Sequence, residues 1–129
     1  KKNVDSVVNI KNEQQSYLEL GNLDVHRDWG YAKDYVFAIQ LITENYNEDF
    51  VISTGVLHSL REFVATAITS ARLNLSINDI VKIDLSLIRP TDITKSYGNP
   101  AKIAADTGWR AKTSFEEMVE KLIKFELNR

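Results

Sequence analysis

The chain has 129 residues, of which 43% are hydrophobic and 26% are charged, so it is long enough for one domain with a core and too short for two. Sixteen Lys and Arg residues against eighteen Asp and Glu residues give a net charge of −2, which argues against a broad basic surface for nucleic acid or an anionic membrane. The chain has no cysteine and only two histidines, which excludes disulfides and thiolate metal sites and makes a metalloenzyme an unfavourable hypothesis.

From the start of the chain we expect a fragment. Lys1 rather than Met opens the sequence, and the residues directly after it already have the pattern of a helix interior. No apolar run approaches the roughly 18 residues that span a bilayer, and the first residues contain no hydrophobic signal-peptide core. We therefore expect a cytoplasmic protein without membrane contact.

The first half of the chain predicts two helices and two strands. Apolar residues at helical spacing predict a helix over 3–12, and alternation over 16–20 before Gly21-Asn22 predicts a strand and a turn. A helix is predicted over 31–44, with one core-facing stripe made of Tyr35, Ala38, Ile39 and Ile42. The apolar run 50–52 predicts a buried strand in a sheet covered by helices.

The second half predicts three helices around one further strand. Ser59 with Glu62 forms a capping box that opens a helix to about residue 73, and 80–85 alternates like a strand. A short helix is predicted to begin at Asn99-Pro100 and to close at Gly108. A second capping box opens the last helix, predicted over 114–127 with an apolar stripe made of Phe115, Met118, Val119, Leu122, Ile123 and Phe125. The fold class is therefore mixed α/β, one unit over 1–129 in which helices alternate with about three strands.

Two arginines lie where predicted strands end. Arg27 follows a strand-end turn, and Arg89 stands where a strand leaves the sheet. Ligands of α/β proteins bind beyond the carboxyl ends of strands, and a guanidinium holds phosphate oxygens in pairs, so these arginines could clamp a diphosphate. The alternative is a pair of surface ion pairs, Arg27 with Asp24 or Asp28 and Arg89 with Asp92.

A few other side chains leave alternatives open. His26 could act as a base or phosphate donor, or simply be solvated. The aromatic residues of 29–35 could stack on a nucleobase or belong to the core. Trp109 has the context of a core anchor between the last two helices.

Several segments resemble one family. LGNLDVHRDWGYAKDYV at 20–36 is similar to the signature segment of GDP-mannose 4,6-dehydratases. STGVLHSLREFV at 53–64, RPTDI at 89–93 and GNPAKIAADTGW at 98–109 resemble later parts of the same family. The resemblance covers nearly the whole chain, and the wider group of extended short-chain dehydrogenase/reductase nucleotide-sugar enzymes shares the looser patterns.

The resemblance implies a set of substrate-binding residues. Arg27 and Arg89 would grip the nucleotide diphosphate, and Gly21 and Asn22 would lie beside the guanine or the ribose. Asp92 stands where the dehydratases usually carry Glu. The sequence therefore departs from the family pattern at the residue that the resemblance implies for the ribose contact.

The resemblance also implies a reaction and a cofactor. Such enzymes have a Rossmann-type fold and oxidise the hexose of GDP-mannose at C4 with bound NADP, eliminate water across C5 and C6 and return the hydride to C6. The product is GDP-4-keto-6-deoxy-mannose, on the route to GDP-fucose. Their glycine loop, Tyr-x-x-x-Lys pair and acidic base lie upstream of the region represented here, so we expect no catalytic and no cofactor-binding residue in this chain. Asp34 is expected to be structural, and the full-length enzyme is expected to be a homo-oligomer.

Other functions stay open. The TGW-like and RPSD-like segments also occur in GDP-4-keto-6-deoxymannose reductases, and other nucleotide-sugar epimerases or dehydratases share the site. A third possibility is a non-catalytic module that binds a nucleotide sugar or a protein. A fragment should expose an apolar patch, for which the stripe Val4, Val7 and Val8 is the candidate.

Overall fold

The computed structural model describes residues 2–88, 91 and 93–129. The elements are, in chain order, α1 Lys2–Lys11, β1 Leu18–Leu20, β2 His26–Arg27, α2 Ala32–Asn45, β3 His58–Ser59, α3 Leu60–Ser70, α4 Ile77–Ile80, β4 Val81–Ile83, the 3-10 turn Leu85–Leu87, β5 Lys95–Ser96, α5 Ala101–Thr107 and α6 Phe115–Leu127. Helices and short strands alternate, which confirms the predicted mixed α/β class.

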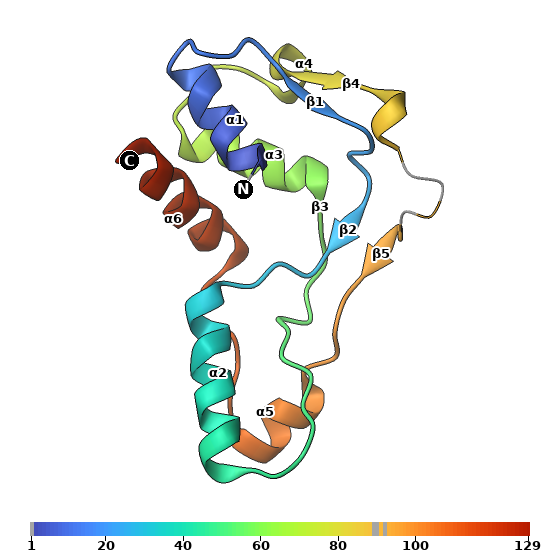
Figure 1. The fold of residues 1–129 in the computed structure, drawn as a ribbon, viewed down its shortest axis with the longest axis vertical. Helices are drawn as coiled ribbons and strands as arrows, with labels where there is room; N and C mark the ends of the chain where they lie inside the picture. The colour runs from blue at the N-terminus through green and yellow to red at the C-terminus, as the bar shows by residue number, and fades with distance from the viewer. Residues whose placement is uncertain (1, 89–90, 92) are drawn as a thin grey trace.

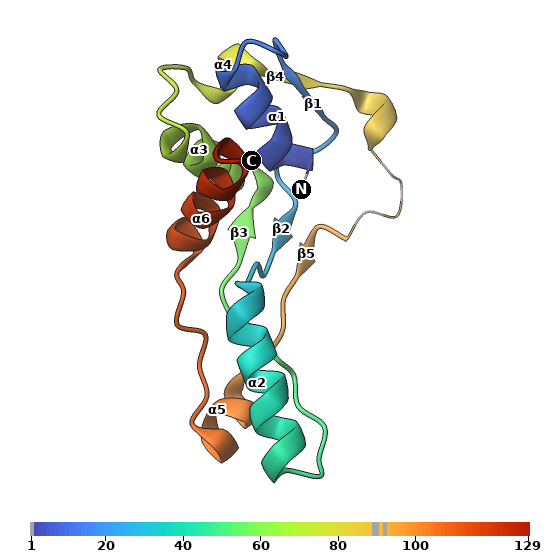
Figure 2. The same ribbon diagram turned by 60° about the vertical axis from the view of Figure 1, so that its left-hand side comes forward.

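The molecule is elongated, with two groups of helices joined by short strands (Figure 1). Helices α1, α3 and α6 pack on one another at one end, next to α4 and the β1–β4 pair. Helices α2 and α5 lie side by side at the other end, as both views show (Figure 2). Strands β2, β3 and β5 lie between the two groups.

The main core is formed where α1, α3 and α6 meet. Its most completely buried large side chains are apolar residues from four helices and one strand: Val7, Leu18, Val64, Ile80, Val119 and Ile123. The stripe Val4, Val7 and Val8 is therefore buried, and the expectation that it forms the exposed patch is wrong. A second, smaller core lies between α2 and α5 and contains Ala38, Ile103 and Trp109.

The described strands number five, where the sequence predicts about three, and they form two small sheets. Strand β1 pairs in parallel with β4, from Leu18 opposite Val81 to Leu20 opposite Ile83. In the other sheet β2 is central, antiparallel to β3 and parallel to β5, and each of these strands has only two residues.

The strand predicted over 50–52 is absent from the described structure. Residues 49–57 have no helix or strand assignment, and Val51 is 54% exposed. A strand is stabilised by hydrogen bonds to a neighbouring strand, and the described residues place none beside this run. The apolar composition identified an extended segment but could not supply its partner.

Helix α2 is apolar on more than one face. Ala38 is buried, but Ile39 of the predicted core-facing stripe is 51% exposed, and Val36 and Phe37 are exposed by 63% and 57%. The prediction of a single core-facing stripe is therefore wrong, because α5 covers only one side of the helix.

Local capping signals mark the helix starts accurately. The Ser59–Glu62 and Ser114–Glu117 capping boxes are both present, and Gly108 closes α5 with a φ of 72°. Helix α3 ends at Ser70, slightly before the predicted end. In α6, Phe125 is 71% exposed and so lies outside the buried stripe. No helix among the described residues is long and apolar enough to cross a membrane.

Candidate substrate-binding site

Segment 20–28 contacts the described parts of a second segment, 84–96, at both of its ends. The N–H of Asp84 donates to the carbonyl of Leu20 over 2.9 Å, and the N–H of His26 donates to the carbonyl of Thr94 over 2.8 Å. Between these two bonds the second segment contains more residues than the first. All five residues predicted to bind substrate belong to these two segments.

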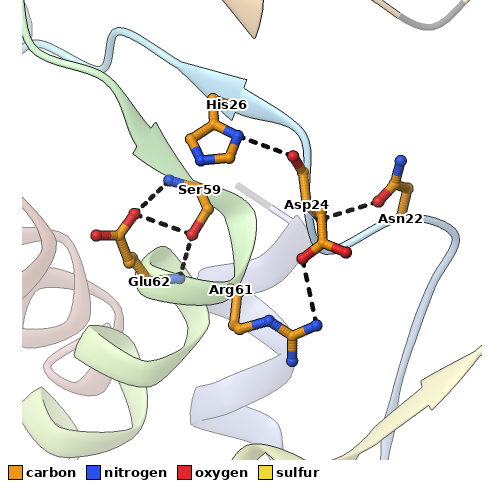
Figure 3. A network of polar contacts seen from close by, with 6 residues as sticks. All are labelled: Asn22, Asp24, His26, Ser59, Arg61 and Glu62. Atoms are coloured by element: carbon orange, nitrogen blue, oxygen red, sulfur yellow. Dashed lines mark hydrogen bonds and ion pairs between the residues drawn. The ribbon is translucent and has the colours of Figure 1, made fainter. Parts of the chain in front are cut away.

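Gly21 and Asn22 lie at one end of segment 20–28. A Cβ atom on Gly21 would lie 2.9 Å from the carbonyl carbon of Leu87 and 3.0 Å from the nitrogen of Ile88, so the close approach of the two segments requires glycine. The side-chain oxygen of Asn22 accepts the N–H of Asp24 over 2.8 Å and stabilises the turn (Figure 3).

Arg27 lies at the other end of this segment, in β2. Its Nη1 donates to the carbonyls of His26 and Ile93, over 2.8 Å and 2.7 Å. A guanidinium has five N–H donors, so it can hold these carbonyls and still reach the oxygens of an anion. The guanidinium thus lies against the segment that carries Arg89 and Asp92, although these two residues are outside the described part of the chain.

The ion pairs proposed as the alternative for Arg27 are not formed. Asp24 pairs with Arg61 instead, over 3.3 Å, as Figure 3 shows. The carboxylate of Asp28 accepts three bonds from the turn at 54–55: the N–H of Thr54 over 3.1 Å, its hydroxyl over 2.5 Å and the N–H of Gly55 over 2.7 Å. Both aspartates therefore have other partners, and sequence reasoning missed the role of Asp28.

His26 belongs to the framework of the sheet. Its ring Nδ1–H donates to the carbonyl of Asp24 over 2.8 Å, and its backbone pairs with Ser59 of β3 (Figure 3). Across this pair, the N–H and hydroxyl of Ser59 both donate to Glu62. The Ser59 backbone bond, then its hydroxyl bond, hold the pKa of Glu62 below its ordinary value, with smaller contributions from His58 and His26.

Asp34 joins α2 to the segment before α6. Its Oδ2 accepts the N–H groups of Lys112 and Thr113, over 3.0 Å and 2.8 Å. Desolvation on its own would raise the pKa of Asp34, but the bonds from Thr113 and Lys112 outweigh it and hold the pKa below its ordinary value. These bonds agree with the structural role expected for this residue.

The pKa of Asp34 predicts an effect on acid stability. A carboxylate whose folded pKa is depressed contributes stability that is present above its unfolded pKa, about 3.9, and is lost as the pH falls through its folded pKa. Asp34→Asn should therefore lower the free energy of unfolding at pH 7 and reduce its fall between about pH 5 and pH 3. Urea unfolding at several pH values measures this, and an unchanged slope against pH would contradict it.

The aromatic residues of 29–35 divide between the two cores. Trp29 packs against Phe63 and Phe115, with ring centroids 5.3 Å and 6.0 Å away, whereas Tyr35 meets Trp109 edge-on at 6.2 Å. The core interpretation is thus confirmed for Trp29 and Tyr35. Trp109 is a core anchor as predicted, but it lies between α2 and α5, not between the last two helices.

A cavity that sequence reasoning missed borders β3 and the turn at 54–55. It has a volume of ≈ 400 Å³ and is lined by Trp29, by residues of 54–58 and by residues of 111–116. The ring of His58 stacks on Phe115 in its wall, with centroids 3.9 Å apart. No sequence motif pointed to it, because its two loops are distant in sequence.

Comparison with known proteins decides the family. The family model described as GDP-mannose 4,6 dehydratase matches residues 1–122. The chain belongs to this family. GDP-mannose 4,6 dehydratase 2 of Caenorhabditis elegans is 35% identical over 92% of this chain and 35% of its own length. GDP-mannose 4,6 dehydratase of Homo sapiens is 35% identical over 92% of this chain and 36% of its own. The chain thus spans about a third of the length of these family members.

Solved structures show the same fold at low sequence identity. RMD from Pseudomonas aeruginosa, solved with NADPH, has a TM-score of 0.86 at 18% identity and covers 98% of this chain and 41% of its own. dTDP-glucose 4,6-dehydratase from Bacillus anthracis, solved with NAD, has a TM-score of 0.79 at 18% identity and covers 98% of this chain and 39% of its own. This family member therefore shares its mixed α/β fold with part of each of these two structures.

Proposed function

We propose that this chain binds the GDP moiety of GDP-mannose, as the substrate-binding part of a dehydratase that forms GDP-4-keto-6-deoxy-mannose. The observation that carries the proposal is the contact between Arg27 and Ile93, which brings a strand-end arginine to the segment of Arg89 and Asp92. Membership of the GDP-mannose 4,6 dehydratase family supports the same substrate.

The nucleotide would lie between segments 20–28 and 84–96. At one end, Gly21 and Asn22 face the start of the longer segment, where Leu87 and Ile88 are 43% and 40% exposed and offer an apolar surface to the guanine or ribose. At the other end, Arg27 and Arg89 would hold the diphosphate, because a planar guanidinium matches phosphate oxygens in pairs.

Asp92 would accept hydrogen bonds from the ribose hydroxyls. A carboxylate has two acceptor oxygens, which suits a sugar diol. Its side chain is shorter by one carbon than the glutamate usual at this position, so the ribose would sit closer to the backbone of the longer segment.

NADP, the cofactor implied by the family, does not fit the residues of this chain. The five glycines of the sequence are scattered, and none forms the G-x-G-x-x-G turn that cradles a dinucleotide. We therefore assign the cofactor and the catalytic groups to a part of the enzyme outside this region. The whole enzyme would be a cytoplasmic homo-oligomer.

The chain of 129 residues is expected to bind GDP-mannose without converting it. Isothermal titration calorimetry measures the binding, and mass spectrometry of the nucleotide sugar detects loss of water. Turnover by this chain alone would contradict the division of labour, and absence of binding would contradict the substrate assignment.

The choice between dehydratase and reductase needs a longer protein that contains this chain. That protein should consume GDP-mannose. If it leaves GDP-mannose intact and reduces the 4-keto-6-deoxy derivative instead, the reductase is the correct alternative.

A further inference from the structure

The sheet that carries Arg27 is minimal. Strands β2, β3 and β5 have two residues each, and isolated pairs of this length are not stable on their own. The direction of the Arg27 side chain therefore depends on bonds that hold β2 from outside the sheet.

Asp28, the residue directly after β2, makes bonds on both sides of it. Its N–H donates to the carbonyl of Ser96, the last residue of β5, over 3.1 Å. Its carboxylate accepts the three bonds from Thr54 and Gly55, in the segment that leads to β3. One residue thus connects the ends of β2 and β5 to the segment that precedes β3.

The turn held by Asp28 is itself well fixed. Gly55 has a φ of 78°, in the region that favours glycine, and a Cβ atom there would lie 3.0 Å from Cδ of Pro100. The hydroxyl of Thr54 also accepts the N–H of Val56 over 3.1 Å. Asp28 therefore anchors β2 to a turn with few alternative conformations.

The same bonds determine which groups can pair with the Arg27 guanidinium. An aspartate beside an arginine commonly forms an ion pair with it, but both carboxylate oxygens of Asp28 are engaged by the turn. The Arg27 guanidinium donates to the carbonyl of Ile93 instead. A neutral carbonyl competes less strongly than a carboxylate with a phosphate for the guanidinium donors.

We propose that Asp28 is a positioning residue for Arg27: the turn at Thr54-Gly55 holds the Asp28 carboxylate away from the guanidinium, and Asp28 in turn fixes the strand from which Arg27 reaches the diphosphate. The inference rests on the proposed function, because it assumes that Arg27 binds phosphate. Loss of the carboxylate leaves the guanidinium less ordered, and the ligand must then supply the ordering free energy.

The test compares two aspartates of the same segment. Asp28→Asn replaces one of the two acceptor oxygens by an amide NH₂. The donors of the turn then have one acceptor too few, or face the NH₂ group. Asp34→Asn is the matched control, because Asp34 also accepts two backbone N–H groups, but from the segment before α6 and not from the turn at Thr54-Gly55. Calorimetry should show that Asp28→Asn binds GDP at least about tenfold more weakly than the unchanged chain, a loss equivalent to one charge-assisted hydrogen bond. For Asp34→Asn the affinity for GDP should change by less than about twofold.

A spectroscopic readout separates positioning from general loss of stability. The Arg27 Nε–Hε signal in a ¹H–¹⁵N spectrum should shift when GDP is added to the unchanged chain, and should shift less in Asp28→Asn at saturating GDP. Equal loss of affinity in both variants would overturn the proposal, and so would an unchanged affinity in Asp28→Asn. If the unchanged chain fails to bind GDP, the proposed function is wrong.

Thr54→Val provides a milder variant in case Asp28→Asn does not fold. It removes the hydroxyl, which donates to Asp28 over 2.5 Å and accepts the N–H of Val56, and it keeps the two backbone bonds from Thr54 and Gly55 to Asp28. GDP binding several-fold weaker than that of the unchanged chain supports the positioning role, and unchanged binding overturns it.

Discussion

Replacing Arg27 by Glu is expected to weaken GDP binding by about 2–5 kcal/mol, because a desolvated diphosphate loses a cation and meets a like charge. The guanidinium lies against the carbonyl of Ile93, so the new carboxylate would point into the same site. Arg89→Glu should have an effect of similar size if the two arginines act as a clamp. Calorimetry with GDP measures both.

Arg61→Glu is the control for this charge reversal. Arg61 lies on α3, its side chain is 50% exposed, and it pairs with Asp24 on the surface. The same change of charge there should alter GDP binding by less than about 1 kcal/mol. Unchanged binding in both Arg27→Glu and Arg89→Glu would exclude the clamp, and an equal effect in Arg61→Glu would reduce it to long-range electrostatics.

Trp109→Ala is expected to lower the stability of the α2–α5 end by about 3–5 kcal/mol, as large-to-small core changes do. Trp109 is 5% exposed, packs with Ala38 and Ile103 and meets Tyr35 edge-on. The second core contains few other buried side chains, so it cannot repack around the loss. Amide hydrogen exchange should become faster in α2 and α5. The exchange rates in α3 and α6 should change much less.

Phe125→Ala is the matched control for Trp109→Ala. Phe125 is 71% exposed on α6, so its truncation removes aromatic area without leaving a cavity and should change the free energy of unfolding by less than about 0.5 kcal/mol. Uniform acceleration of exchange through α1, α3 and α6 in Trp109→Ala would show that the two ends unfold together and would contradict a separate second core.

Helix starts could be predicted from the sequence because their causes are local. Ser59 with Glu62 and Ser114 with Glu117 satisfy each other's backbone groups within four residues, so the pattern carries the whole interaction. The helix α1 stripe was also found from spacing, although spacing alone could not say that α3 and α6 would cover it.

Long-range contacts explain what the sequence left out. The apolar run 50–52 needed a strand partner that no local pattern reveals, and α2 needed a second covering element to bury Ile39. Asp28 meets Thr54 and Asp34 meets Thr113 across long stretches of chain, so their roles as acceptors appear only in the folded structure.

The candidate site shows the same division. Strand-end position alone suggested Arg27 and Arg89, and the family resemblance added Gly21, Asn22 and Asp92. The folded chain brings the segments of these residues into contact through the bond from Arg27 to Ile93, which no spacing rule could give. The direct contacts of Arg89 and Asp92 remain predictions.

The most direct test of the central claim is to map the GDP site on this chain by ¹H–¹⁵N chemical-shift changes during a titration with GDP. Binding between segments 20–28 and 84–96 predicts that the largest shifts fall at Gly21, Asn22, Arg27 and residues of 87–94. Shifts concentrated around the cavity of Trp29 and His58 instead, or no saturable shifts at all, would contradict it.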